Sequence, residues 1–404
     1  MSLDITEELI ARQPPEAQAI IRLLLAKIAE LEAKLNKTPQ NSSLPPSSQH
    51  PHAKPSGKKP RGKKKRGGQP GHPKHERKLI PIEQCDQVIP LQPGDCRRCG
   101  ESLSGTDDDP LRHQVWELPE IKPHVTEYQR HRLCCDACGE TTCAELPPGV
   151  PAGQAGPRLI AFTALLMAYF RQSKRRTAKF LETILGQPAS AAWTVKLQNR
   201  ATDALRPAYD ELAQSLPQQS HLGADETPTK EATSKSWLWT FVASSFTVFA
   251  IRPTRAATVL TELLSGFKGV VGCDRAKMYW QCGRLQWCWA HLQRDFQALI
   301  DSDDGQVKRL GRDLMRPTGE LFRQWCRWRD GTITGAGRKR LLRPRRTENE
   351  ALLLRGVYSG NARLVGMCEE LYNHRDWLWT FLDQEGVEPP NNVSERALSH
   401  AVIW

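Results

Sequence analysis

Three acidic residues in distant parts of the chain have the types and settings of a metal-binding site. Asp225 lies in Leu222-Gly223-Ala224-Asp225-Glu226-Thr227-Pro228, a strand-like run that Pro228 is expected to stop. Asp274 ends an apolar, β-branched run that begins at Gly269, and Glu395 falls in the first turn of a predicted helix. Because Mg²⁺ prefers carboxylate oxygens, these acids could hold two Mg²⁺ ions, an arrangement that serves phosphoryl transfer.

Each acid also has a simpler interpretation. An aspartate at the end of a strand is often a turn residue, and Asn392 with Glu395 three residues later fits a helix capping box. Glu226 adjoins Asp225, but successive residues of a strand face opposite sides, so only one of the two can face the metals.

The segments around the acids predict how they are positioned. Runs at 237–242 and 246–252 predict a hairpin around Ser244-Ser245, followed by a helix at 256–267 and a strand ending at Asp274. With the first strand central and the later strand parallel beside it, both aspartates would meet at one sheet edge. This order predicts an RNase H-like α/β catalytic core over 216–404.

The 120 residues between Asp274 and Glu395 exceed what one strand-helix unit needs. Helical apolar spacing predicts an all-helical insertion at about 292–382, with a basic loop from Arg338 to Arg346. Cys288 and His291 could form half a metal site, but no second pair is near in sequence. We expect them to pack where the insertion meets the core.

Two Cys-x-x-Cys-Gly motifs predict one structural Zn²⁺ held by Cys96, Cys99, Cys135 and Cys138. Cys134 could replace Cys135, but only Cys135 gives the two-residue gap to Cys138. The residues between the motifs, 114–118 and 124–133, alternate like a hairpin and indicate a zinc ribbon at 81–150. Cys85 and Cys143 are expected to be ordinary thiols.

Basic residues are concentrated in two segments. Lys54 to Lys78 contains eleven Lys or Arg and a single acid, Glu76, and has no apolar periodicity, so we expect a disordered basic linker over 38–80 that contacts phosphates. Residues 157–206 predict three helices with Ser190 capping the third, either a helix-turn-helix domain over 151–215 or a plain helical bundle. The residues predicted to bind DNA are Lys58, Lys59, Arg61, Lys63, Lys64, Lys65, Arg66, Arg175, Arg176, Lys196 and Arg200.

The totals indicate a multidomain α+β protein with a polyanionic partner. A chain of 404 residues suggests about two to four domains, and the formal charge is +12. The longest apolar run, 159–170, is too short to cross a membrane, and the N-terminus lacks a signal pattern, so we expect a cytoplasmic protein. Its twelve cysteines are then metal ligands and buried thiols. Leucine and isoleucine heptad spacing at 15–36 predicts a leucine-zipper-like helix within 1–37, although it could equally pack on its own protein.

The local wording resembles the DDE transposases of the bacterial insertion sequence 66 family. The similar stretches are GADET, GCDRAKMYW followed by CWAH, NNVSERAL, and the linker words NSSLPPSS and KKRGGQPGH. The resemblance selects Asp225 over Glu226. It implies an enzyme that holds two Mg²⁺, binds transposon terminal inverted repeats in double-stranded DNA, cleaves a strand and transfers it to target DNA.

The resemblance also implies a homo-oligomer formed through the N-terminal helix, and possible accessory transposition proteins. Members of the family continue beyond the point where this sequence ends, which implies a truncated chain with weak or no activity of its own. Two other functions fit the same residues: a catalytically inactive, zinc-dependent DNA-binding protein, and a DNA nuclease that cuts without joining.

Overall fold

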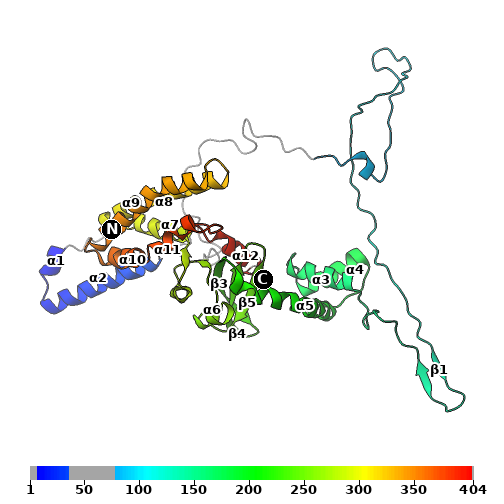
Figure 1. The fold of residues 1–404 in the computed structure, drawn as a ribbon, viewed down its shortest axis with the longest axis horizontal. Coiled ribbons are helices and arrows are strands. Elements are labelled where there is room, and N and C mark those ends of the chain that lie inside the picture. Colours follow the sequence, from blue (N-terminus) through cyan, green and yellow to red (C-terminus); the bar gives the residue numbers. More distant parts are fainter. Residues whose placement is uncertain (1–6, 36–77, 403–404) are drawn as a thin grey trace. The chain divides into compact units, whose positions relative to one another are not determined.

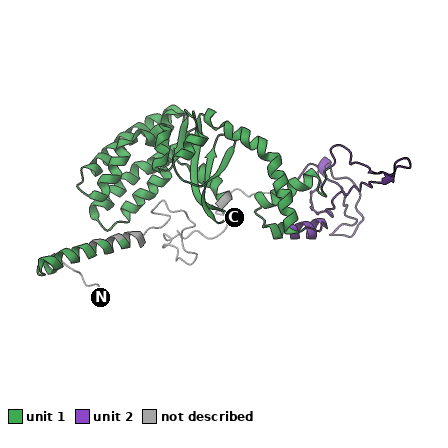
Figure 2. Cartoon of the chain, turned by 90° about the horizontal axis from the view of Figure 1, so that it is seen from below, with its two compact units in different colours: residues 1–53, 151–177, 190–404 green, residues 54–150, 178–189 purple. Residues whose placement is uncertain are grey.

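The computed structural model describes residues 7–35 and 78–402. The chain divides into two compact units, one of residues 1–53, 151–177 and 190–404, the other of residues 54–150 and 178–189 (Figure 2). The first unit holds all three predicted catalytic acids, and the second holds all four predicted zinc ligands. Each is described separately below.

The N-terminal helices agree with the heptad pattern. Helix α1 (Glu7–Ala11) precedes α2 (Pro15–Leu35), which confirms the predicted helix at 15–36. The stripe residues Leu24, Ile28 and Leu31 are 54%, 50% and 49% exposed. None of the helices in the described parts of the chain has the length and apolar character needed to span a bilayer.

The second unit has little regular structure. Between residues 78 and 150 it contains a short 3-10 helix, η2 (Ile82–Gln84), and a two-stranded sheet of β1 (Arg132–Cys134) and β2 (Thr141–Cys143). The hairpin predicted between 114–118 and 124–133 is wrong, because β1 instead pairs with β2 on the far side of the second cysteine motif. Val115, Leu118 and Val125 are 79%, 74% and 80% exposed, so their alternation buries no face that could hold a strand in register.

Three helices follow, as predicted. They are α3 (Pro157–Ala168), α4 (Lys174–Leu185) and α5 (Ala191–Gln214). The Ser190 side chain accepts a hydrogen bond from the Trp193 amide at 3.1 Å and so caps α5 as expected. Helix α5 is longer than the predicted third helix. Its Tyr209 hydroxyl donates to the Phe249 carbonyl at 2.8 Å, which attaches the helix to the sheet that follows.

A five-stranded sheet with the order β5-β4-β3-β6-β7 forms the centre of the first unit (Figure 1). Its strands are β3 (His221–Glu231), β4 (Ser234–Val242), β5 (Thr247–Arg252), β6 (Val270–Cys273) and β7 (Leu285–Trp287). The strands β3, β4 and β5 pair antiparallel, while β6 lies parallel to both β3 and β7. The predicted hairpin, the central first strand and its parallel neighbour are therefore confirmed.

Two local predictions, one in the sheet and one in the helix that follows β5, are wrong in their bounds. Strand β3 continues through Pro228 to Glu231 instead of stopping at the proline. Strand β6 pairs with β3 only at 221–223, so beyond that point β3 has β4 on one side alone. A proline is tolerated on such an unpaired edge because its missing N–H removes no sheet hydrogen bond. The helix predicted at 256–267 is shorter, as α6 (Thr258–Leu263).

The segment between β7 and the last helix is helical throughout, as predicted. After the 3-10 helices η3 (Leu216–Gln218) and η4 (Lys277–Cys282) of the core come α7 (Trp289–Ile300), α8 (Gly305–Arg329), α9 (Gly335–Val357), α10 (Ala362–Asn373) and α11 (Asp376–Asp383). The chain then returns to the sheet as α12 (Asn392–Val402). The basic loop predicted at 338–346 is wrong, because these residues lie inside α9. Arg338 is buried there with its guanidinium 4.0 Å from the Trp328 ring centre.

Candidate active site

Helix α12 lies very close to the central strand β3. The Asn391 side chain donates from Nδ2 to the Ala224 carbonyl at 2.7 Å and accepts from the Ser394 hydroxyl at 2.8 Å. A Cβ added at Gly223 would lie only 2.5 Å from Ser394 Oγ, so the helix can approach this strand only because residue 223 is glycine. These contacts fix the start of the Glu395 helix beside the residue that precedes Asp225.

Asp225 and Asp274 come from adjacent strands of the sheet. Asp225 lies within β3, and Asp274 directly follows β6, which runs parallel to β3 at 221–223. Asp225 accepts a hydrogen bond from the Glu226 amide at 3.0 Å, and Asp274 accepts one from the Ala276 amide at 2.9 Å. The interpretation of Asp274 as a turn residue accounts for its hydrogen bond with the Ala276 amide. It does not account for the position of Asp274 beside β3.

The carboxyl group of Asp225 lies in an unusually negative environment. Burial raises its pKa most, and the carboxylates of Glu226, Asp274 and Glu395 raise it further, to about 8. The structure therefore brings Asp274 and Glu395 close enough to Asp225 to raise the pKa of its carboxyl group.

Glu395 is held by residues from the start of α7. Its Oε1 accepts a hydrogen bond from Arg294 Nη2 at 3.0 Å and lies 3.6 Å from His291 Nε2. The capping-box interpretation of Asn392 and Glu395 is wrong, because Asn392 is already the first helical residue and Glu395 faces α7. Sequence reasoning missed Arg294, although it lies three residues after the histidine of the CWAH motif.

Glu226 has a separate role from Asp225. Its side chain is 1% exposed and accepts hydrogen bonds from the Tyr279 hydroxyl and from Arg255 Nε, the latter at 2.6 Å. Burial raises its pKa to about 7, with a further contribution from Asp274, while Tyr279 and Arg255 oppose the rise. The Arg255 Nη2 also lies 3.9 Å from Asp274 Oδ2. Arg255 and Tyr279 were not predicted, although Tyr279 is part of the GCDRAKMYW run.

The described part of the first unit does not show a completed metal centre. Among residues 7–35 and 78–402, no group of three or more His, Cys, Asp and Glu side chains has the arrangement of a metal site. The donors that gather around Asp225 are nevertheless all carboxylates, the ligands that suit Mg²⁺.

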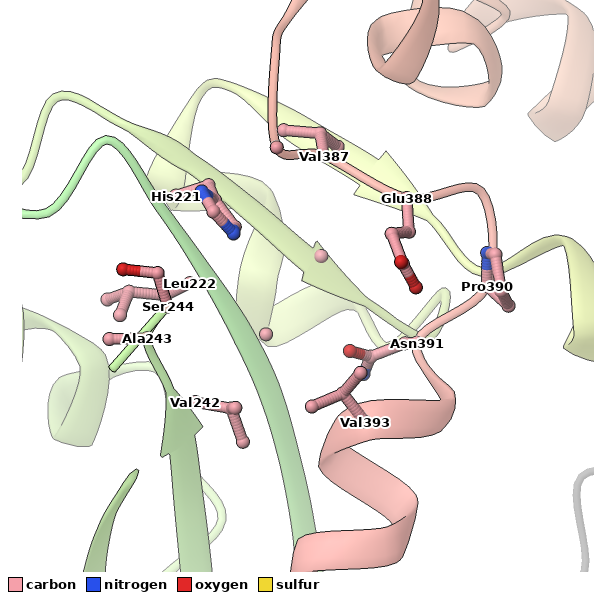
Figure 3. Close-up of a pocket in the computed structure, with 13 residues that line it drawn as sticks. His221, Leu222, Val242, Ala243, Ser244, Val387, Glu388, Pro390, Asn391 and Val393 are labelled. Carbon is pink, nitrogen blue, oxygen red and sulfur yellow. The ribbon is translucent and has the colours of Figure 1, made fainter. Parts of the chain in front are cut away.

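A small pocket of about 220 Å³ opens beside the start of β3 (Figure 3). Its walls include His221 and Gly223 from β3, Ser244 after β4, and Glu388 and Asn391 before α12. Burial lowers the pKa of His221, and this effect exceeds the rise that the nearby charge of Glu388 causes. None of Asp225, Asp274 and Glu395 lines this pocket, so it is distinct from the acidic site.

Cys288 and His291 differ in their surroundings. Cys288 is buried at the start of α7, and its Sγ accepts a hydrogen bond from the Asn391 amide at 3.1 Å. The expected packing role where the insertion meets the core is thus confirmed for Cys288. His291 instead faces Glu395, and burial lowers its pKa, with a further lowering from Arg294.

Each cysteine motif in the second unit forms a tight knuckle. In the first, Gly100 has a φ of +77° and its amide donates to the Cys96 carbonyl at 2.9 Å. In the second, Gly139 has a φ of +72° and its amide donates to the Cys135 carbonyl at 2.8 Å. In the first knuckle, hydrogen bonds from the backbone amides of Cys99 and Arg98 lower the pKa of the Cys96 thiol. In the second, the amides of Ala137 and Cys138 lower the pKa of the Cys135 thiol. The four cysteines are free thiols, and the described structure does not gather them into one four-ligand group.

The residues predicted to bind DNA fall in two places. Arg175 and Arg176 are exposed in the first turn of α4, and Lys196 and Arg200 are exposed one turn apart on α5. The remaining seven lie outside the described residues: Lys58, Lys59, Arg61, Lys63, Lys64, Lys65 and Arg66.

Comparisons with known families cover most of the chain. Residues 152–403 match the family described as the Transposase IS66 family, and residues 6–78 match a family of unknown function (DUF6444). A search of curated proteins finds no match. The first match spans well over half of the chain and includes the sheet, the helical insertion and α12. The chain therefore belongs to the IS66 family of transposases.

Proposed function

We propose that this chain is a DDE transposase that binds the terminal inverted repeats of its transposon, cleaves one DNA strand and transfers the freed 3′ end to target DNA. One observation carries the proposal: Asp274 after the parallel strand β6 and Glu395 on α12 both lie close enough to Asp225 in β3 for their carboxylates to raise its pKa. The central β3 with antiparallel neighbours on one side and parallel strands on the other supports an RNase H-like core.

Asp225, Asp274 and Glu395 would hold two Mg²⁺ ions. The donor set fits, because hard oxygen ligands and an excess of negative charge suit a divalent cation. Burial raises the pKa of Asp225 most, and the neighbouring carboxylates add to the rise. When bound, magnesium supplies Lewis-acid activation of the attacking oxygen and stabilisation of the leaving oxygen.

Neighbouring residues of the chain position these ligands. Arg294 and His291 orient the Glu395 carboxylate from α7, and Asn391 holds the start of α12 on β3. On the other side, Arg255 bridges Glu226 and Asp274. Alternation of faces along a strand lets only one of Asp225 and Glu226 face the metals. The family resemblance selects Asp225 as the metal ligand, and Glu226 would be a positioning residue.

The second unit would bind one structural Zn²⁺ through Cys96, Cys99, Cys135 and Cys138. Both knuckles already direct backbone amides at a cysteine sulfur, which favours the thiolate form that zinc requires. Closing the site requires the two knuckles to come together, and zinc binding would supply the free energy for that step.

DNA would be bound by α4, α5 and the basic segment at 54–78, and chains would pair through α2. The exposed Leu24, Ile28 and Leu31 give α2 an apolar stripe that a second copy could cover. Deleting 54–78 should flatten the salt dependence of DNA binding, since each lost phosphate contact removes roughly one unit of log–log slope. An unaltered slope would show that the segment is a solvated tail.

A second candidate is a DNA-binding protein without catalysis. The observation in its favour is that Glu395 Oε1 is engaged by Arg294 and that the acids do not form a completed metal group in the described residues. A nuclease that cuts without joining is the remaining alternative.

The deciding experiment is an assay of cleavage and strand transfer with the purified chain. The substrate is a duplex carrying the inverted repeat that flanks the gene, with Mg²⁺ and a supercoiled target. Joined product with the unaltered chain, none with Asp225→Asn or Asp274→Asn, and normal product with the exposed control Asp303→Asn would support the transposase. Cleavage without joining would indicate the nuclease. Repeat binding without Mg²⁺-dependent cleavage would indicate the regulator.

A further inference from the structure

Five arginines form one continuous stripe along helix α8 of the insertion. They recur at intervals of three, four, seven and four residues, which places them on one side of an α-helix. All five are exposed, whereas Leu310, Leu314 and Leu321 of the same helix are buried. The stripe consists of Arg309, Arg312, Arg316, Arg323 and Arg327.

The middle of this stripe borders a groove of about 620 Å³ where α8 meets α9. The groove is lined by Met315, Arg316, Gly319, Glu320, Arg323 and, from α9, Arg345. Gly319 leaves its floor open, because a Cβ added there would meet nothing within 4 Å. We call these residues, together with Arg309, Arg312 and Arg327, the arginine groove.

Acidic side chains neutralise only part of this charge. Glu348 is shared by Arg316, at 2.6 Å, and Arg345, while Glu320 pairs with Arg323 at 2.8 Å. At the margin of the stripe, Asp313 pairs with Arg355. Within the described residues Arg309 and Arg312 have no acidic partner. Six arginines against two acids leave an excess of positive charge that a solvated helix face with interspersed signs would not have.

The length of the stripe suits an extended polyanion such as duplex DNA. Eighteen residues separate Arg309 from Arg327, and at about 1.5 Å per residue the stripe extends over roughly 27 Å. That is about eight base pairs of duplex DNA at roughly 3.4 Å each, far longer than a small anion. Guanidinium groups match phosphate oxygens in a bidentate geometry.

The groove lies on a helix that packs against the helix of the active site. A Cβ at Gly311 of α8 would lie 2.7 Å from Leu299 Cβ near the end of α7, and a short loop makes the two helices antiparallel neighbours. Residues of α8 beyond Gly311 therefore run back along α7 towards its first turns, where His291 and Arg294 face Glu395. Arg316 thus lies at about the level of Arg294 along the helix pair, and Arg323 lies beyond the start of α7.

We propose that the arginine groove binds the sugar-phosphate backbone of double-stranded DNA, as a contact additional to the basic segment and to α4 and α5. The inference rests on the proposed function, because it takes DNA as the ligand. It adds that the helical insertion itself holds a duplex beside the active site.

Gly319 provides the most direct test. Gly319→Glu adds an acid to the groove floor where space is open, and replacing a helical glycine should also favour the fold. We expect this variant to bind a labelled 30-base-pair duplex about tenfold more weakly, Gly319→Lys to bind at least as tightly as the unaltered chain, and Gly319→Ala to be unchanged. Equal affinity of the glutamate and lysine variants would overturn the proposal.

A second measurement uses the salt dependence of binding. Arg316→Gln with Arg323→Gln should reduce the log–log slope by about two units, one for each phosphate contact. The matched control is Lys268→Gln with Arg284→Gln, which removes the same charge at exposed positions before β6 and β7, at the opposite ends of those strands from Asp274. A control that lowers the slope equally would mean that net charge alone is responsible, and would overturn the inference.

The two proposals fail in different ways. If the unaltered full chain binds no DNA, both the transposase function and this inference are wrong. If it binds and cleaves DNA while the groove variants behave normally, only this inference is wrong. Thermal unfolding of each variant confirms that any loss of affinity comes from a folded protein.

Discussion

Arg294 Nη2 donates a 3.0 Å hydrogen bond to Glu395 Oε1, joining two residues that lie 101 positions apart in the sequence. The bond connects the first helix of the insertion to the helix that carries the third acid. The insertion therefore contributes to the candidate active site, since it supplies the group that contacts Glu395. His291, on the same face of α7, is the second contact.

Removing the hydrogen bond between Arg294 and Glu395 should lower the rate of strand cleavage more than it lowers the stability of the fold. Arg294→Gln is expected to reduce strand cleavage about tenfold, because a carboxylate displaced by even part of an ångström is poorly placed for its role. Arg294→Lys should retain an intermediate rate, and the exposed Arg284→Gln should leave the rate unchanged. Initial rates at saturating Mg²⁺ measure the effect. A faster Arg294→Gln enzyme would show instead that the arginine restrains Glu395.

The buried network behind Asp225 should contribute measurably to stability. Tyr279→Phe removes the hydroxyl that donates to Glu226 and should destabilise the chain by about 1–3 kcal/mol, because a buried carboxyl group loses a hydrogen bond. Urea unfolding measures the change. Adding Glu226→Gln completes a double-mutant cycle, in which the two residues should couple by about 0.5–3 kcal/mol. Additive effects would mean that the two side chains act independently.

The pH dependence of stability should reveal the acidic cluster. The pKa of Asp225 is about 8 in the folded chain against an ordinary 3.8, so the folded state binds the proton more tightly than the unfolded state. Its contribution is therefore most favourable below about pH 4 and is lost as the pH rises towards 8. With a chelator present to remove divalent metals, Asp225→Asn should have a higher thermal unfolding temperature than the unaltered chain at pH 8. This difference in unfolding temperature should shrink towards pH 5. A difference that is constant with pH would contradict the raised pKa.

The sequence predicted the sheet and the insertion well because both depend on periodicity over many residues. The run before Asp274 is continuously apolar, and it became the buried strand β6. The predictions that failed depended on partners. Pro228 continues in β3 because β6 does not pair with that part of the strand. The hairpin predicted between 114–118 and 124–133 does not form, because its apolar side chains are exposed among the described residues.

The proximity of Asp274 and Glu395 to Asp225 could be predicted from sequence, but the residues that contact these acids could not. Arg255, Tyr279 and Arg294 lie 29, 53 and 101 positions from the carboxylates they contact, so no local pattern connects them. Alternation along β3 did separate Asp225 from Glu226. What Glu226 contacts depends on tertiary packing that brings η4 and the loop between β5 and α6 to β3.

The zinc site provides the last prediction. Purified chain should contain one zinc, held by Cys96, Cys99, Cys135 and Cys138, because the two knuckles each present a pair of thiols with lowered pKa at one member. Cys96→Ser with Cys138→Ser should abolish the metal. Cys134→Ser should keep it, since the Cys134 Sγ lies 3.4 Å from the Gly139 carbonyl and the knuckle amides serve Cys135 instead. Metal analysis by mass spectrometry gives the stoichiometry. Because zinc would join the two knuckles, a chelator should expose the segment between them to limited proteolysis at 103–131, while the five-stranded sheet and the helical insertion stay resistant. Zinc retained in the Cys96→Ser/Cys138→Ser chain, or lost on Cys134→Ser alone, would overturn this ligand set.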